Sequence, residues 1–178
     1  MKNNWFVITA APSSGKTTTI NLLSRLGYKT AHETARLYIE SELKKGLTME
    51  EIRKDQLSFQ MKILAMQQEL EASLTKSEIT FLDRAIPDTM AYLIFRKCLI
   101  PDFFLDIYKE SARKYKKVFI LDRLPFEKDH VRVEDDQDSR MIHDLLIKSY
   151  MEIGLEIVSV PVMEKKERVE FILKNADF

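Results

Sequence analysis

The sequence contains few of the residues on which disulfide scaffolds, metal clusters and flexible linkers depend. Of its 178 residues, one is cysteine and 4 are glycine. The lone cysteine, Cys98, excludes an internal disulfide and a multi-cysteine metal site, and we expect it to be a small buried hydrophobe. The scarcity of glycine argues against long flexible linkers between separate domains.

The sequence also lacks an excess of charge and long apolar runs. Lysine plus arginine and aspartate plus glutamate each number 28, so the formal net charge is zero. This balance argues against a protein whose main partner is a nucleic acid or an anionic membrane. The apolar run at 5–10 is too short for a signal peptide, and no segment approaches the length of a membrane span. We therefore expect a cytoplasmic protein with no membrane partner.

Apolar segments of strand length alternate with helical patterns along the chain. The expected strands cover residues 5–10, 28–32, 79–82, 118–121 and 155–160. The expected helices cover residues 16–26, 34–45, 48–73, 87–97, 101–114, 139–152 and 164–175. Such alternation is typical of an α/β domain in which helices cover both faces of a parallel sheet. We interpret residues 1–178 as a single domain, with the charged, aperiodic residues 123–138 as an inserted lid.

A phosphate-binding loop lies between the first expected strand and the first expected helix. The segment Ala10-Ala11-Pro12-Ser13-Ser14-Gly15-Lys16-Thr17 has the P-loop spacing Gly-x-x-x-x-Gly-Lys-Ser/Thr, with alanine in place of the first glycine. Backbone N–H groups of such a loop surround phosphates at a helix N-terminus. The residues expected to bind a nucleoside triphosphate are Ala11, Pro12, Ser13, Ser14, Gly15, Lys16, Thr17 and Thr18. We expect the lysine to reach the terminal phosphates and the Thr17 hydroxyl to bind Mg²⁺.

Two of the expected strands end in an aspartate that is suited to a second contact with Mg²⁺. Asp83 follows residues 79–82, Asp122 follows residues 118–121, and each aspartate is followed by arginine. Asp83 is the better candidate because its strand is expected beside the first strand. Asp122 would lie at the mouth of the lid. For either residue, the alternative is a solvated aspartate at a strand end.

A glutamate and an arginine follow the second expected strand. At the carboxyl end of a strand near the P-loop, Glu33 could face the γ-phosphate and orient or deprotonate an attacking hydroxyl or water. Arg36 lies three residues later on the same helical face, where it could bind an anionic group of the substrate. The alternative for Glu33 is a carboxylate that only stabilises a helix N-terminus.

Several segments together resemble one protein family. The P-loop, His32–Arg36 and Asp83–Tyr92 are similar to segments of small P-loop ATPases grouped with the kinase domain of NadR-type nicotinamide riboside kinases. The likeness continues at residues 118–134, 150, 154, 160–161 and 167–172. It therefore spans nearly the whole chain. It is specific for the family and much less so for the substrate.

The resemblance implies a nucleoside-kinase-like fold, with a five-stranded parallel sheet in the order 2-3-1-4-5 and a lid that carries arginines. Arg132 is the residue we expect over the phosphates, where its charge would stabilise the transferring phosphoryl group. Arg123, Lys128 and Arg140 are weaker candidates. The alternative is that residues 127–140 form only a solvated loop.

By the same resemblance, two residues at the end of the third strand would face the acceptor. Arg84 would contact the acceptor, and Asp88 would hydrogen-bond substrate hydroxyls or orient Arg84. Ala10 departs from the usual loop pattern, and no set of residues in the sequence reads a particular base or ring.

The sequence leaves more than one function open. We favour an ATP- and Mg²⁺-dependent kinase that transfers the γ-phosphoryl group to a hydroxyl of a nucleoside- or nucleotide-like acceptor. The alternative is an ATPase that acts as a regulatory switch or assembly partner, and a kinase acting on nucleic-acid ends is disfavoured by the zero net charge. No Asn-Lys-x-Asp motif is present, which favours ATP over GTP. The oligomeric state, including a homodimer, is left open.

Overall fold

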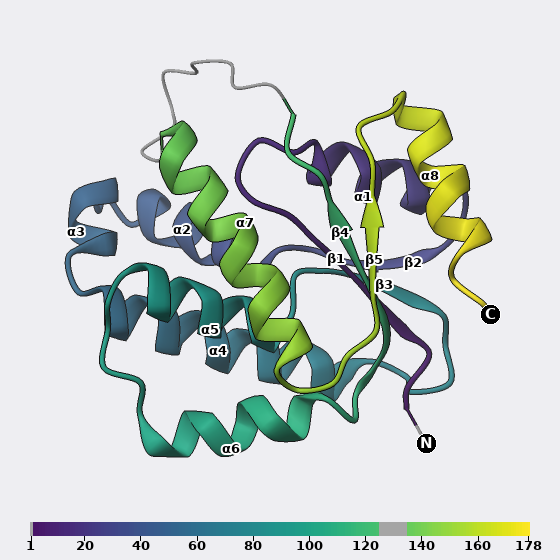
Figure 1. Cartoon of the computed structure of the whole chain (residues 1–178). Helices are drawn as coiled ribbons and strands as arrows, with labels where there is room; N and C mark the ends of the chain where they lie inside the picture. Colours follow the sequence, from purple (N-terminus) through teal and green to yellow (C-terminus); the bar gives the residue numbers. More distant parts are fainter. Residues whose placement is uncertain (1, 125–134) are drawn as a thin grey trace.

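The computed structural model describes residues 2–124 and 135–178. Five strands form a parallel sheet in the order β2-β3-β1-β4-β5, as the resemblance implied (Figure 1). The strands are β1 (Trp5–Thr9), β2 (Lys29–Ala31), β3 (Thr80–Asp83), β4 (Tyr115–Leu121) and β5 (Ile157–Val160). The helices are α1 (Lys16–Arg25), α2 (Thr34–Lys44), α3 (Met49–Arg53), α4 (Gln56–Ser73), α5 (Ile86–Phe95), α6 (Asp102–Ser111), α7 (Asp136–Met151) and α8 (Lys165–Lys174).

Both faces of the sheet are covered by helices. Successive side chains of a strand point to opposite faces, and every residue of β1 is buried. Phe6 and Ile8 pack with apolar residues of α1 and α8, whereas Trp5 and Val7 pack with Tyr150 of α7. Figure 1 shows α4, α5 and α7 on one side of the strands and α8 on the other. The continuous apolar pattern of the central strands follows from this double coverage.

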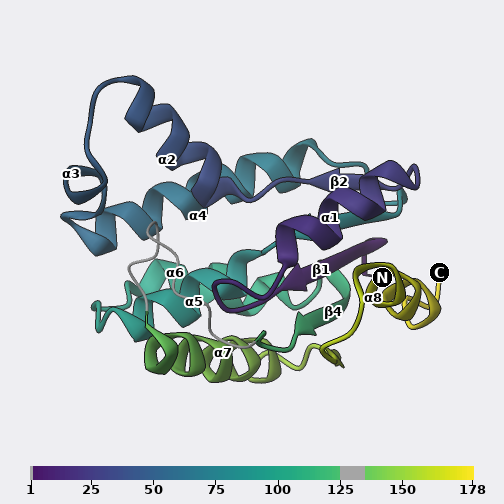
Figure 2. The same ribbon diagram turned by 90° about the horizontal axis from the view of Figure 1, so that it is seen from above.

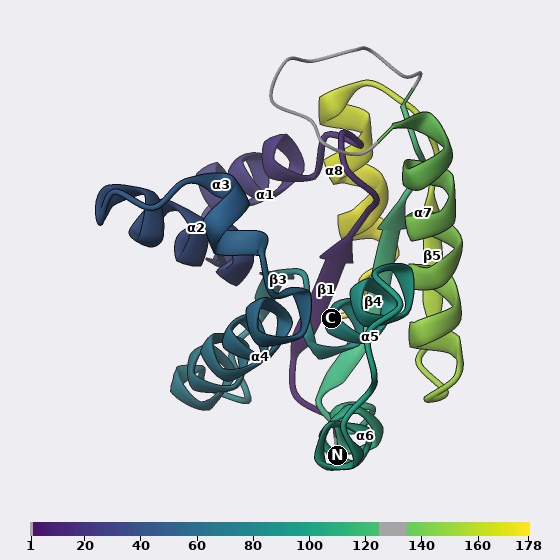
Figure 3. The same ribbon diagram turned by 90° about the vertical axis from the view of Figure 1, so that its left-hand side faces the viewer.

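The α2–α4 region differs from the single helix expected over residues 48–73. α3 ends at Arg53, and α4 begins after Asp55, whose carboxylate accepts a hydrogen bond from the Ser58 N–H at 3.0 Å. The capping box of Thr48 and Glu51, which the sequence predicted, is present at the start of α3. Figures 2 and 3 show α2 and α3 projecting from the rest of the molecule beside α4.

Other element boundaries also differ from the expected ones: α6 ends at Ser111 and β5 begins at Ile157, each inside its expected range. β4 begins at Tyr115 instead of residue 118, because Tyr115 is fully buried and pairs with β1. α7 begins at Asp136, capped by the Asp135 carboxylate, so the last three residues of the expected lid are helical. Among the described helices, none combines the length and apolar character that a membrane span requires.

Candidate active site

The P-loop joins the end of β1 to the start of α1 and is closed by its own side chains and backbone. The Ser14 hydroxyl donates a hydrogen bond to the Ala11 carbonyl at 2.9 Å. Left-handed backbone angles occur at Ser13 (φ 74°) and Gly15 (φ 77°), and not at Ala10. Alanine at position 10 is therefore compatible with this loop, and its methyl group is buried in the core between the sheet and α1.

A buried arginine from the far end of the chain supports the loop. Arg168 of α8 donates from Nη1 to the Ser14 carbonyl at 3.1 Å and from Nη2 to the Met163 carbonyl at 3.5 Å. A Cβ added to Gly15 would lie 2.6 Å from Arg168 Nη1. Glycine is thus required here by the left-handed φ and also by the guanidinium packed against the loop.

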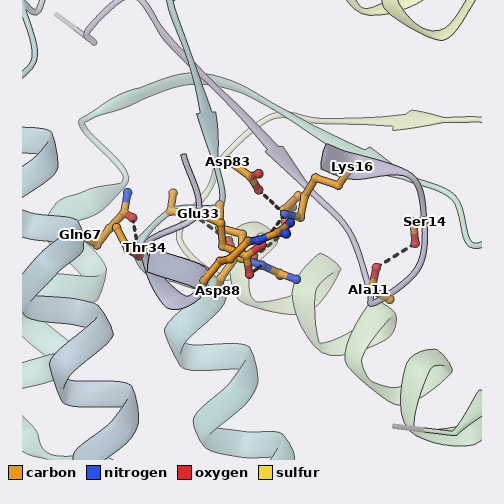
Figure 4. Close-up of polar contacts among 12 residues, drawn as sticks. Ala11, Ser14, Lys16, Glu33, Thr34, Gln67, Asp83 and Asp88 are labelled. Carbon is orange, nitrogen blue, oxygen red and sulfur yellow. Dashed lines mark hydrogen bonds and ion pairs between the residues drawn. The ribbon is translucent and has the colours of Figure 1, made fainter. Parts of the chain in front are cut away.

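Lys16 lies between two carboxylates. Its ammonium group donates to Glu33 Oε2 at 3.0 Å and also pairs with Asp83 Oδ1 (Figure 4). Lys16 and Asp83 are buried, and Glu33 lies at the N-terminus of α2 without capping it. The structure therefore brings together one residue from the P-loop, one from the end of β3 and one from the β2–α2 junction. Sequence reasoning placed all three at the site.

Arg84 connects this group to α5. Its Nε donates to Glu33 Oε1 at 2.8 Å, and its Nη1 donates to Asp88 Oδ1 at 2.8 Å. The guanidinium carbon lies 5.3 Å from the centre of the Tyr92 ring. Arg84 has a φ of 70°, a left-handed value that is uncommon for arginine. The turn after β3 thus directs the side chain back across the carboxyl ends of the strands, where open α/β sheets bind ligands.

Asp88 is surrounded by hydrogen-bond donors. In addition to Arg84, its Oδ1 accepts from the Thr9 hydroxyl at 2.6 Å. Its Oδ2 accepts from the Ala85 N–H at 3.1 Å and from the Tyr150 hydroxyl. Both oxygens are therefore engaged by this chain, and the contacts favour the second of the two roles considered from the sequence, orientation of Arg84.

The two carboxylates around Lys16 have pKa values that are shifted in opposite directions. For Glu33, burial alone would raise the pKa, but the charges of Arg84 and Lys16 outweigh it and lower the pKa to about 2. For Asp83, burial has the larger effect and raises the pKa, in spite of the Lys16 charge, and the Glu33 charge adds to the rise. Glu33 is therefore firmly ionised in this arrangement.

The residues at this end of the sheet fit the donor set that Mg²⁺ uses in nucleotide sites. Mg²⁺ prefers oxygen ligands and is commonly bound by one or two protein groups together with phosphate oxygens and water. Thr17 supplies a hydroxyl at the start of α1, and Asp83 supplies a carboxylate at the end of β3. Groups of three or more histidine, cysteine, aspartate or glutamate side chains suited to a metal do not occur among residues 2–124 and 135–178. Such a group is characteristic of a metal cage built wholly from protein, which Mg²⁺ bound with phosphates does not need.

A pocket of about 720 Å³ continues from the P-loop past Glu33 and Arg84. It is lined by one face of α4, by α5 and by the start of α2. The wall side chains include Phe59, Gln60 and Tyr92, which sequence reasoning missed. Helical spacing in the sequence gives no sign that these side chains line a pocket. Only the placement of α4 and α5 in the fold shows it.

The remaining predicted residues differ in their relation to this pocket. Arg36 lines it, but its side chain is largely exposed and its Nε donates to Glu40 at 3.0 Å. Asp122 accepts a hydrogen bond from the Ser159 hydroxyl at 2.7 Å and does not line the pocket. Arg123 and Arg140 both pair with Asp136 at the start of α7. Arg132 and Lys128 lie outside the described residues, and their lid roles stay predictions.

The fold has close counterparts among solved structures. A NadR protein in complex with NR superposes with a TM-score of 0.69 at 15% identity, over 98% of this chain and 51% of that one. Thymidylate kinase from Ehrlichia chaffeensis gives a TM-score of 0.67 at 17% identity, over 96% of both chains. Deoxyadenosine kinase from M. mycoides with bound dCTP gives 0.63 at 14% identity, over 96% of this chain and 97% of that chain. The chain thus spans about half the length of the NadR structure, and it has the fold of P-loop nucleoside and nucleotide kinases.

Comparison at the level of sequence gives the family. No protein with a curated description matches the sequence. The family model described as an AAA domain matches residues 5–168, which include the P-loop, Glu33, Arg84 and Arg168. The chain therefore belongs to this AAA-domain family of P-loop proteins.

Proposed function

We propose that this protein is a kinase that transfers the γ-phosphoryl group of ATP to a hydroxyl of a nucleoside- or nucleotide-like acceptor. The proposal rests on a series of ion pairs that links Lys16 to Glu33, Glu33 to Arg84 and Arg84 to Asp88. These residues line the pocket together with the P-loop, which would bind ATP, and with α4 and α5, which line the half proposed for the acceptor. A site that only hydrolyses ATP has no need for a large, side-chain-lined compartment beyond the γ-phosphate. A phosphotransferase needs one to hold its acceptor in line.

The P-loop half of the pocket would bind ATP. Backbone N–H groups of residues 11 and 13–18 would surround the phosphates, and Lys16 would contact the terminal ones. Mg²⁺, held by Thr17 and Asp83, would neutralise charge on the β- and γ-phosphates. Arg132, which lies outside the described residues, is predicted to add positive charge beside them.

Glu33 would act on the acceptor hydroxyl. While Lys16 and Arg84 pair with Glu33, they lower its pKa to about 2, which makes it a weak proton acceptor. When the Lys16 ammonium turns to the phosphates of ATP, Glu33 loses one of its two cations and its pKa rises. The glutamate would then orient the acceptor hydroxyl and take its proton as the oxygen attacks the γ-phosphorus. Binding of ATP would in this way prepare the base.

The acceptor half of the pocket favours a small ring-containing molecule. Phe59 and Tyr92 are aromatic side chains of the pocket wall, and the Arg84 guanidinium lies over the Tyr92 ring. The similar solved structures include a NadR protein in complex with NR and a deoxyadenosine kinase with bound dCTP. These neighbours support a nucleoside-like acceptor here.

An ATPase that serves as a switch remains the competing function. It shares the P-loop and the Mg²⁺ ligands with the kinase, so only the fate of the phosphoryl group separates the two. The assay incubates the protein with Mg·ATP and a panel of nucleosides, nicotinamide riboside and nucleoside monophosphates, and follows each acceptor by mass. We expect phosphorylation of one acceptor class that is lost in Lys16→Ala and Glu33→Gln and retained in Glu110→Gln. Glu110 is an exposed residue of α6 and a matched control. ATP hydrolysis at the same rate with and without every acceptor would refute the kinase.

A further inference from the structure

Two glutamines of α4 are buried in the same wall of the pocket but differ in their hydrogen bonding. Gln67 is 3% exposed; its Oε1 accepts from the Thr34 hydroxyl at 3.2 Å and its Nε2 donates to Glu71 Oε1 at 3.0 Å. Gln60 is 4% exposed, and its amide makes no hydrogen bond within the part of the chain that the structure describes. Gln67 is part of the internal structure, whereas the amide of Gln60 is left for a group inside the pocket.

The amide of Gln60 faces the pocket, and its polar atoms are not among the buried, unpartnered ones of the described residues, so solvent reaches them. A ligand that covers the amide removes this solvent. A buried polar group without a partner costs about 1–3 kcal/mol, so such a ligand has to supply hydrogen bonds of its own. A ligand that offers both a donor and an acceptor to Gln60 is therefore favoured over one that leaves either atom of the amide without a partner.

The surroundings of Gln60 indicate what kind of ligand fits. Phe59, its neighbour in α4, and Tyr92 of α5 also line the pocket, and aromatic side chains in a pocket wall favour a flat ring as ligand. The carboxylates that line the pocket belong to Glu33 and Asp88, and Arg84 holds both at the P-loop side. The amide of Gln60 is a neutral group that a ring in the pocket can contact, with one acceptor oxygen beside one donor nitrogen.

We infer that Gln60 is a specificity-determining residue that reads a planar heterocycle carrying a hydrogen-bond donor next to an acceptor, as in an amide, a lactam or an aminopyrimidine edge. The inference rests on the proposed acceptor site and narrows its ligand to rings with this edge. Rings whose donor is blocked or replaced by a carboxylate would leave the Gln60 oxygen without a donor and would bind more weakly.

The experiment compares matched acceptors and matched variants. Three acceptors have a free edge, with a hydrogen-bond donor next to an acceptor: uridine, inosine and nicotinamide riboside. Each is paired with an analogue whose edge is altered, in the same order N3-methyluridine, N1-methylinosine and nicotinic acid riboside. Kinetic constants for phosphorylation, and affinities by calorimetry with a non-hydrolysable ATP analogue and Mg²⁺, are measured for wild type, Gln60→Leu and Gln56→Leu. Gln56 is a suitable control because it lines the same pocket but its amide already donates to the Arg53 carbonyl at 2.7 Å.

For the ring that wild type accepts, we expect a preference of at least about tenfold for the free edge, lost in Gln60→Leu and kept in Gln56→Leu. The KM for ATP should be unchanged in both variants. Because Gln60 has no internal hydrogen bond to lose, Gln60→Leu should melt at or above the wild-type temperature. If wild type binds and phosphorylates the free-edge and altered-edge acceptors equally well, the inference is overturned and the kinase is left intact. A preference that survives Gln60→Leu has the same consequence. Selective binding without phosphorylation would overturn the kinase and support the inference, and absence of both binding and phosphorylation would overturn both.

Discussion

Replacing Asp88 by asparagine changes one atom in the most heavily bonded side chain of the site. In the wild type, Oδ1 accepts from Thr9 and Arg84, and Oδ2 accepts from the Ala85 N–H and the Tyr150 hydroxyl. Asparagine can keep its oxygen toward Arg84 and Thr9. Its NH₂ group then faces two donors, and although the tyrosine hydroxyl can rotate to accept, the Ala85 N–H cannot.

The expected loss of stability has two parts. An unpaired buried N–H costs about 1–3 kcal/mol, and weakening a hydrogen bond between two charged groups costs about 1.5–3 kcal/mol. Arg84 keeps its bond to Glu33, which limits the second part. We therefore expect Asp88→Asn to lower the free energy of unfolding by about 3–5 kcal/mol, the range found when a buried pair loses one partner. For a domain of this size, that lowers Tm by roughly 10 °C.

Urea unfolding at pH 7, followed by circular dichroism, measures the change directly. Asp106→Asn is the matched control because Asp106 is an exposed residue of α6 without a hydrogen bond or ion pair among the described residues, and it should shift stability by less than about 0.5 kcal/mol. Asp88→Asn should also lower acceptor turnover, since Arg84 loses the carboxylate that fixes it. A variant as stable as the control would refute the interpretation of Asp88 as the residue that orients Arg84.

Three further predictions concern Glu33, Gly15 and Arg132. The pKa of Glu33 is about 2, below its ordinary value of 4.5, so its stabilising effect is present above pH 4.5 and is lost as the pH falls toward 2; the stability difference between wild type and Glu33→Gln should shrink over that interval in urea titrations, and a constant difference would contradict the assignment. Gly15→Ala should lower both Tm and ATP affinity, because the new Cβ meets Arg168 Nη1 and the φ is left-handed; adding Arg168→Ala should restore only part of the Tm, and full restoration would mean that the backbone angle carries no strain. Arg132→Ala should reduce turnover far more than ATP affinity, as measured by kinetics and calorimetry, and unchanged turnover would remove Arg132 from the mechanism.

Much of the fold could be predicted from local patterns. The apolar strands, the P-loop between β1 and α1, and the capping box at Thr48 each depend on residues close in sequence. The break between α3 and α4 was missed because helical spacing continues across it; the pair Asp55 and Ser58 was the signal that could have marked it. The sheet order came from the family resemblance, since strand patterns alone do not fix which strands are neighbours.

The site residues that end or follow a strand could be predicted from the sequence, whereas those contributed by α4 and α8 could not. Lys16, Glu33 and Asp83 each end or follow a strand, and the carboxyl ends of parallel strands meet at one edge. Arg168 contacts Ser14 from a position 154 residues later, and Gln60 faces the pocket only because of how α4 packs. Roles of this kind depend on tertiary packing, for which the local sequence carries no signal.

The fate of the γ-phosphoryl group shows directly whether the protein is a kinase or an ATPase without an acceptor. ATP labelled with oxygen-18 in its γ-phosphate is incubated with the protein, Mg²⁺ and the acceptor panel, and the label is located by mass spectrometry. We expect the labelled phosphoryl group to appear mainly as an ester of one ring-containing acceptor, and we expect Glu33→Gln to abolish this ester. If the label appears only in inorganic phosphate, at a rate indifferent to every acceptor, the protein is not the kinase proposed here.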